Sequence, residues 1–180
     1  ELDQLRSERS SSVSMGMVYR TREGEDGLSR LADIQVPIEG RIAVGDGKIV
    51  VTATPTTLDA GTPAYDFSTA SRFGAGPSAA LAQAFGAVSM PGSQAASGVG
   101  LSVGYEGQNF DAAVGTTPLG FKESNVIGHL RYRGSFTDSL SFKGELSRRP
   151  VTDSLLSFAG TEDVRTGETW GGVVATGGRA

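Results

Sequence analysis

The feature that most constrains the fold is an alternation of apolar or small residues with mostly polar ones over residues 126–137. Leu130 and Tyr132 fall on one side of an extended chain here, whereas His129 and Arg131 fall on the other. Successive side chains of a β-strand point to opposite faces of a sheet, so this period predicts a strand with one apolar and one polar face. The same alternation predicts further strands over residues 12–22, 28–44, 48–59, 99–106, 110–117 and 140–147, with a last strand beginning at Trp170.

The connections between these strands fall into two alternating sets. Those at residues 45–47, 107–109 and 137–138 are tight, whereas those at residues 23–27, 60–97, 118–125 and 150–169 are longer. When strands pair sequentially and antiparallel, alternate connections lie at opposite ends of the sheet, and short turns at one end with long loops at the other are the pattern of an outer-membrane barrel. We therefore predict an all-β fold, an antiparallel up-and-down meander of about eight strands that forms roughly half of an outer-membrane β-barrel.

Three local signals refine this prediction. Pro37 has no backbone N–H for a ladder hydrogen bond, so a bulge or break is expected within its strand. Leu2 and Leu5 are spaced as on one face of a helix, which predicts a short N-terminal helix over residues 1–11. A second short helix is expected around residues 77–85, inside the longest loop.

Composition excludes several classes of protein. Across 180 residues the net charge is only −4, which leaves no electrostatic footprint for nucleic acid, and the absence of cysteine excludes disulfides and thiolate metal sites. The 26 glycines and a hydrophobic content of 38% suit many short strands and turns better than helices. No run approaches the ~20 apolar residues of a membrane-spanning helix, but transmembrane β-strands need only ~9–11 residues with one apolar face.

The polar face of the predicted strands carries charges at mid-strand, which suits a water-filled barrel interior. The apolar face mixes small residues with larger ones, as a lipid-facing surface does, and the residues near strand ends, where interfacial girdles form, include Tyr19, Tyr105, Tyr132, Phe136 and Trp170. A soluble antiparallel sandwich or lipocalin-like barrel, with its apolar face inward, is the alternative. The residues predicted to line the pore are Asp33, Gln35, Glu39, Thr52, Thr54, Asp111, His129, Arg131, Arg133, Lys143 and Glu145.

Four segments resemble the bacterial cellulose synthase operon protein C family, in the family's order. They are residues 148–174 (RRPVTDSLLSFAGTEDVRTGETWGGVV), residues 22–31 (REGEDGLSRL), residues 57–61 (TLDAG) and residues 114–121 (VGTTPLGF). The resemblance implies that a periplasmic helical-repeat domain precedes an outer-membrane barrel. It divides this chain into a linking helix over residues 1–11 and the N-terminal half of the barrel over residues 12–180, within which residues 60–97 are a long extracellular loop.

The resemblance also implies a function and a location. The chain is expected to be part of a passive, porin-like channel that exports cellulose, a β-glucan, from the periplasm through the bacterial cell outer membrane. Its expected partners are the cellulose chain, outer-membrane lipid and the periplasmic parts of the cellulose synthase complex, and residues 60–97 are the best candidate for a plug or gate. A soluble carbohydrate-binding β-domain and a structural outer-membrane barrel that passes no polymer are the alternatives.

The last long connection carries candidate loop or interface residues, namely Arg148, Arg149, Asp153 and Trp170. The two arginines could pair with Asp153, Glu162 or Asp163 and pin the loop over the pore, or they could contact anionic lipid headgroups. Trp170 could anchor the chain at the membrane interface, where tryptophan is enriched, or it could stack against a sugar.

No catalytic residue, cofactor site or metal site is predicted, so the chain is not expected to be an enzyme. Adjacent acids such as Glu162 and Asp163 sit in a turn-rich loop, where solvated carboxylates are expected rather than a glycosidase pair. His129 is the only histidine, so a histidine metal cluster or a catalytic triad lacks partners.

Overall fold

The computed structural model describes residues 10–75, 91–137, 140–164 and 166–179. Two regions that the sequence predicts to be helical, the N-terminal segment and residues 77–85, therefore lie wholly or almost wholly outside the described residues, as does the tight connection at 138–139. The described elements are β1 (Ser12–Met15), β2 (Val18–Arg22), β3 (Leu31–Gln35), β4 (Ile38–Val44), β5 (Gly47–Gly61), α2 (Phe67–Ala70), η1 (Ser71–Ala75), β6 (Gln94–Glu106), β7 (Phe110–Thr116), β8 (Val126–Thr137), β9 (Leu140–Pro150), α4 (Leu155–Ala159), β10 (Thr161–Glu162), β11 (Thr169–Trp170) and β12 (Val174–Arg179).

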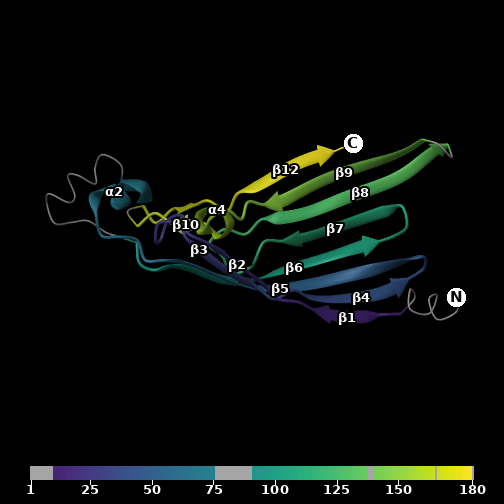
Figure 1. Cartoon of the computed structure of the whole chain (residues 1–180), viewed down its shortest axis with the longest axis horizontal. Coiled ribbons are helices and arrows are strands. Elements are labelled where there is room, and N and C mark those ends of the chain that lie inside the picture. The colour runs from purple at the N-terminus through teal and green to yellow at the C-terminus, as the bar shows by residue number, and fades with distance from the viewer. Residues whose placement is uncertain (1–9, 76–90, 138–139, 165, 180) are drawn as a thin grey trace.

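One antiparallel sheet of ten strands makes up most of the molecule (Figure 1). β1 and β2 are two parts of one run of chain, as are β3 and β4, which leaves eight runs that pair in sequence order. The sheet is open, with the β1–β2 run at one edge and β12 at the other. The predicted all-β antiparallel meander is therefore confirmed.

The interruption at Pro37 is also confirmed, and it is shared by the neighbouring run of chain. Gly16 N donates a hydrogen bond of 2.9 Å to Pro37 O, and Val36 N donates one of 2.9 Å to Pro55 O. The two edge runs therefore bend together at this point, because proline offers no N–H to continue the regular ladder.

The connections separate as predicted. The turns after β4 and β6 lie at one end of the sheet, on the right of Figure 1, where β8 also ends and β9 begins, and the longer connections after β2, β5, β7 and β9 lie at the other end. α2, α4, β10 and β11 all belong to this long-loop end. Among the described residues, none of the helices has both the length and the apolar character needed to cross a membrane.

Three predicted strand starts were wrong, each for a local reason. Residues 28–30 form a turn whose three N–H groups donate to Glu25 O at 3.0 to 3.1 Å, so the strand predicted from residue 28 begins at Leu31. β6 begins at Gln94, well before the predicted residue 99, because β5 continues to Gly61 and pairs with this Ala- and Gly-rich stretch. Trp170 does not begin the last strand of the main sheet: it pairs with Thr161 in a separate two-stranded sheet, and β12 begins at Val174.

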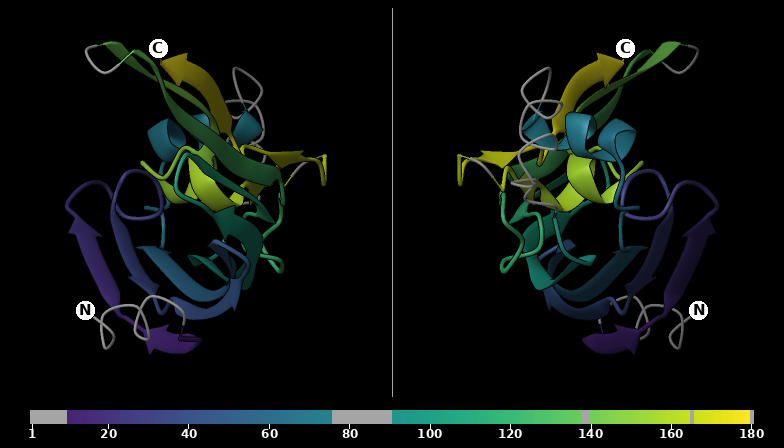
Figure 2. Two further views of the ribbon diagram at one scale, coloured as in Figure 1. Left: turned by 90° about the vertical axis from the view of Figure 1, so that its right-hand side faces the viewer. Right: turned by 90° about the vertical axis from the view of Figure 1, so that its left-hand side faces the viewer.

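The sheet curves, and α4 lies on its inner side (Figure 2). The one apolar core cluster of the described residues forms there, where Leu155, Phe158 and Ala159 of α4 pack against sheet and loop residues. Their partners in the cluster are Leu31, Leu58, Ala60 and Phe121, with Ala96 at its margin. The core therefore sits on the concave face at the long-loop end, and it joins the connection after β9 to the sheet.

Candidate functional site

The strand register places every residue predicted to line a pore on one face of the sheet, and that face is the concave one. On β5, Thr52 and Thr54 lie an even number of residues from Leu58 and therefore share its face. Leu58 packs in the core cluster against α4, so this face is the concave one. Thr52 lies opposite Glu39 on β4, and the other predicted residues follow across the strands as direct partners or on alternate positions. The predicted alternation therefore gathers these side chains on one surface.

A row of ion pairs crosses the concave face near the tight turns, and we call it the charge belt. It consists of Glu39, Arg41, Glu106, Asp111, His129, Arg131 and Glu145. Arg41 Nη2 lies 3.0 Å from Glu39 Oε1 and 3.4 Å from Glu106 Oε1, which links β4 to β6 across β5. In the register Arg41 lies opposite Val50 of β5, whereas Glu106 lies opposite Lys48, so the Arg41–Glu106 pair crosses β5 diagonally.

The second half of the charge belt joins β7, β8 and β9. His129 Nε2 lies 2.6 Å from Asp111 Oδ1, and Arg131 lies 3.7 Å from Asp111 Oδ1 and 3.6 Å from Glu145 Oε1. These side chains are 28 to 41% exposed, so each pair contributes only about 0–1 kcal/mol to stability. The charge belt therefore presents charges of both signs to solvent on the concave face rather than holding the fold together.

Asp33 and Gln35 share the concave face but are not open to it in the same way. The Asp33 side chain is only 1% exposed, and it accepts hydrogen bonds from Arg20 Nη2 at 2.7 Å and from Gln35 Nε2 at 2.9 Å. Burying an ionised carboxylate is costly unless it is paired and hydrogen-bonded, and Arg20 supplies the pairing. Asp33 is therefore a buried, hydrogen-bonded residue at the long-loop end of the concave face.

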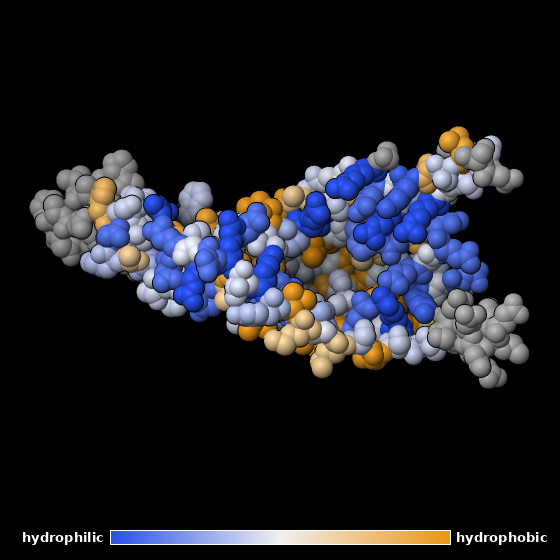
Figure 3. All heavy atoms as spheres, viewed as in Figure 1, coloured by the Kyte–Doolittle hydropathy of each residue, from blue (hydrophilic) through white to orange (hydrophobic). Residues whose placement is uncertain are grey.

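The convex face has the opposite character, because large apolar side chains stand exposed along it. Val51 is 49% exposed, Val114 is 54% exposed and Leu146 is 60% exposed, on three different strands. Figure 3 shows hydrophilic residues gathered over the sheet near the tight turns and hydrophobic residues along its lower margin. Exposed apolar surface on this scale marks a surface that meets something other than water.

The connection after β9, residues 151–173, folds inward across the mouth of the concave face. Its helix α4 is capped by Ser154, where a capping box joins Ser154 and Ser157 in both directions. Its return is held by Asn125 Nδ2, which donates to Gly172 O at 2.7 Å, and by Glu123 N, which donates to Ala159 O at 3.0 Å. Since its apolar residues enter the core cluster, this connection, here called the inward loop, is a packed part of the fold.

Two arginines from the opposite edge of the sheet hold the start of the inward loop. Arg20 on β2 donates to Thr152 Oγ1 at 3.0 Å and to Thr152 O at 3.1 Å, and Arg22 Nη1 donates to Asp153 O at 2.8 Å. These contacts span 131 and 132 positions in the sequence, and they join the β1–β2 run to the connection that leads to β12. The sequence offers no local signal for them.

The candidate loop residues are distributed differently from the predicted pairings. Arg148 lies on the convex face, where its Nε donates to Val126 O at 2.9 Å, and Arg149 lies on the concave face opposite Ala175. Glu162 Oε2 pairs with Lys122 Nζ at 2.6 Å. Asp153 takes part in pinning through its backbone carbonyl, which receives Arg22. Trp170 is 57% exposed in the connection between β9 and β12, beside Thr161.

The described residues contain no cluster of acidic or histidine side chains arranged to hold a metal ion. Glu162, one of the two adjacent acids singled out from the sequence, forms a surface ion pair with Lys122, whereas its neighbour Asp163 is 7% exposed. What the arrangement offers instead is a curved wall with a charged inner face, an apolar outer face and a loop folded over one end.

These features define a class of proteins: antiparallel β-sheets that curve around a polar interior and expose apolar residues outward. Residues 29–180 match the family described as the C-terminus of cellulose synthase operon protein C, and the chain belongs to this family. The predicted family resemblance is thereby confirmed.

Curated relatives match nearly the whole chain. It is 40% identical over 182 residues to cellulose synthase operon protein C of Pseudomonas fluorescens (strain SBW25), covering 99% of this chain and 13% of the relative. It is 30% identical over 308 residues to cellulose synthase operon protein C of Xanthomonas axonopodis pv. citri (strain 306), covering 98% of this chain and 20% of the relative. Cellulose synthase 2 operon protein C of Komagataeibacter xylinus is 35% identical, with 94% of this chain and 13% of the relative covered. The chain thus spans a fifth or less of the length of these three relatives.

Proposed function

We propose that this chain forms one half of an outer-membrane β-barrel through which a β-glucan leaves the periplasm. Its role is that of a passive conduit rather than a catalyst, and its partners are the glucan chain, membrane lipid and the periplasmic part of the cellulose-synthesising machinery. The polymer comes from the printed names of the relatives, which are cellulose synthase operon proteins. The open sheet edges at β1 and β12 would be completed by further strands, because an unpaired edge in lipid leaves backbone groups unsatisfied.

The observation that carries the membrane assignment is the reversal of polarity between the two faces. A soluble antiparallel sheet places its apolar face inward and its polar face in water. Here the concave face carries the charge belt, whereas Val51, Val114 and Leu146 stand exposed on the convex face. Lipid on the outside and water on the inside satisfy both faces at once.

Adjacent residues on β5 test this assignment, because Val51 points to the convex face and Thr52 to the concave face. Val51→Arg in the full-length protein is expected to cost about 2–4 kcal/mol if the residue faces the bilayer midplane. Thr52→Arg places the same side chain opposite Glu39 and is expected to be tolerated. The fraction that assembles in lipid vesicles, and the urea midpoint of the assembled protein, report the difference. Equal tolerance of both variants contradicts the proposal, because an exposed position in a soluble domain changes stability by only about ±0.5 kcal/mol.

The charge belt suits the passage of a neutral, hydroxyl-rich polymer. Carboxylates accept hydrogen bonds from hydroxyl groups, and arginine and lysine donate to them, so a wall of mixed charge can exchange contacts with a sliding glucan without binding one ion strongly. Arg41 and Arg131 stand between acids on both sides, at 3.0 to 3.7 Å. We propose that the charge belt keeps the passage wet and weakly selective.

Reversing one charge in the charge belt should change the ion selectivity of the passage. Arg131→Glu places a third carboxylate between Asp111 and Glu145, and we expect the cation-to-anion permeability ratio to rise about threefold, because rings of acidic side chains favour cations. Lys122→Glu makes the same charge change outside the sheet and is expected to leave the ratio unchanged. Reversal potentials of the full-length protein in planar bilayers, under a salt gradient, measure both. An unchanged ratio in Arg131→Glu means that residue 131 does not line a conducting path.

The inward loop gives this passage a constriction. It crosses from the β9 side to the β2 side of the concave face and packs α4 against the wall. The sequence assigned the plug or gate to residues 60–97, but residues 76–90 of that segment lie outside the described residues. We propose that the inward loop narrows the outer end of the passage.

A further inference from the structure

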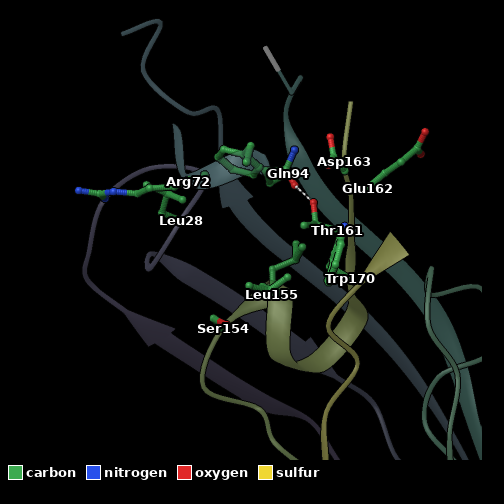
Figure 4. A pocket seen from close by; sticks show the side chains of 12 residues that line it. Leu28, Arg72, Gln94, Ser154, Leu155, Thr161, Glu162, Asp163 and Trp170 are labelled. Carbon is green, nitrogen blue, oxygen red and sulfur yellow. Dashed lines mark hydrogen bonds between the residues drawn. The ribbon is translucent and has the colours of Figure 1, made fainter. Parts of the chain in front are cut away.

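An open cavity lies among the loops at the long-loop end, with a volume of about 470 Å³. α4, β10 and β11 line one side, whereas η1, the start of β6 and the turn at Leu28 line the other (Figure 4). The volume falls within the range of about 300–1,000 Å³ that small-molecule sites occupy in proteins. The cavity therefore has room for a ligand of a few rings.

Trp170 has the largest side chain of the residues that line this cavity. It is 57% exposed, and its backbone is fixed by pairing with Thr161 in the two-stranded sheet. Leu155 and Phe73 add apolar wall, with exposures of 4% and 8%. A large aromatic ring left open beside a cavity, on a short paired strand, provides a ready flat surface for a ligand at little cost in side-chain entropy.

Polar groups stand beside that apolar wall. Thr161 Oγ1 donates to Gln94 Oε1 at 2.7 Å, the dashed bond in Figure 4, and Gln94 Nε2 donates to Gly92 O at 2.9 Å. After these bonds, the hydroxyl oxygen of Thr161 and the amide oxygen of Gln94 retain lone pairs that can accept hydrogen bonds, and the amide nitrogen of Gln94 retains a second N–H. These groups can therefore both accept hydrogen bonds from the hydroxyl groups of a ligand and donate one to them.

Of the three charged residues that line the cavity, Arg72 and Glu162 form ion pairs with residues outside its lining, and Asp163 is only 7% exposed. Glu162 binds Lys122, and Arg72 binds Glu25. In Figure 4 the Arg72 side chain and the Glu162 carboxylate both point away from the centre of the cavity. The cavity therefore offers no unbalanced charge from these residues, and this favours a neutral ligand.

We propose that this cavity is a saccharide subsite at the outer end of the passage, with Trp170 as the platform for a pyranose ring. A pyranose has an apolar face of C–H groups that matches an aromatic ring, and a rim of hydroxyls that matches acceptors such as Thr161 and Gln94. The identity of the sugar rests on the proposed function, since a glucan that leaves the passage would reach the outer loops. Trp170 then acts as a contact for the polymer at its exit.

The test is the binding of cellohexaose to the full-length protein in detergent micelles, measured by calorimetry and by tryptophan fluorescence. Trp170→Ala is expected to weaken binding about tenfold, the equivalent of about 1.4 kcal/mol. Trp170→Phe keeps an aromatic ring and is expected to weaken binding less than Trp170→Ala while removing the sugar-dependent fluorescence change. Because Trp170 is largely exposed, neither variant is expected to disturb folding. The matched control is Tyr65→Ala, which removes another aromatic residue of the outer loops, 74% exposed, that is not among the residues lining the cavity.

The outcomes separate the subsite from the passage. If Trp170→Ala binds cellohexaose as tightly as the unmodified protein does, the proposed saccharide subsite is wrong. The proposed passage is judged separately, by whether Val51→Arg blocks membrane assembly. If Trp170→Ala and Tyr65→Ala weaken binding equally, the effect is unspecific and the subsite is again wrong. If Val51→Arg and Thr52→Arg are tolerated alike but binding depends on Trp170, the membrane passage is wrong and the saccharide subsite stands on its own.

Discussion

Replacing Phe158 by alanine is expected to release the inward loop and to raise the conductance of the full-length protein about twofold, because conduction depends on the narrowest cross-section of a pore. Phe158 is 5% exposed, and its ring meets that of Phe121 edge-on, with centroids 5.2 Å apart and planes at 87°. Truncating such a buried ring costs about 3–5 kcal/mol. The inward loop buries few other large side chains, so this loss falls mainly on α4.

Single-channel recordings in planar bilayers measure the effect. The matched control is Leu156→Ala on the same helix, because Leu156 is 45% exposed and lies outside the core cluster. We expect its conductance to equal that of the unmodified protein, since its backbone carbonyl still accepts from Gly160 and Gly172. Sensitivity of the inward loop to protease shows whether Phe158→Ala has released it. If the loop is released but the conductance stays unchanged, the inward loop does not limit the passage.

The sheet could be predicted from the sequence because its two organising signals are local. Alternation of apolar and polar residues reports one strand at a time, and the tight turn after Val44 and the break at Pro37 follow from glycine and proline chemistry. The same signal fails where side chains are small, and for this reason the start of β6 at Gln94 was missed. In that stretch, alanine, serine and glycine carry too little contrast in polarity to show a period of two.

The inward loop could not be predicted in the same way, although one signal was present. Leu155 and Phe158 are spaced three residues apart after Ser154, the pattern of a short capped helix with one apolar face. The side to which that helix folds depends on long-range packing against Leu58, which no local pattern reports. Arg148 and Arg149 were expected to hold the inward loop because they precede it directly in the sequence. Arg20 and Arg22 hold it instead, because the fold brings them close to Thr152 and Asp153.

Two kinds of interaction hold the inward loop in place. Apolar packing of α4 fixes its depth on the concave face, and hydrogen bonds from Arg20 and Arg22 fix where it starts across the mouth. Loss of apolar packing is expected to release α4 from the sheet. Loss of Arg20 is expected to destabilise the sheet as well, because Arg20 also neutralises the buried Asp33. The two kinds of variant should therefore differ in which property they change most.

Arg20→Ala is accordingly expected to lower the free energy of unfolding by about 1–3 kcal/mol, the cost of leaving a buried acceptor without its partner. The loss stays below that for a fully buried ion pair because the Arg20 side chain is 45% exposed. Asp33 is 1% exposed, and Arg20 Nη2 lies 2.7 Å from its Oδ2. Arg20→Lys keeps the positive charge but not the forked geometry that reaches Thr152, so a smaller loss is expected. Urea unfolding of the full-length protein in lipid vesicles measures these differences.

Asp33→Asn separates the buried charge from the lost contact with the inward loop. In the Arg20→Ala background it removes the uncompensated carboxylate, and we expect it to restore most of the stability but not the hydrogen bonds to Thr152. The double variant should then be nearly as stable as the unmodified protein while its inward loop is cut faster by protease. If the double variant is no more stable than Arg20→Ala alone, the buried charge is not the source of the loss, and the role of Arg20 lies in holding the inward loop.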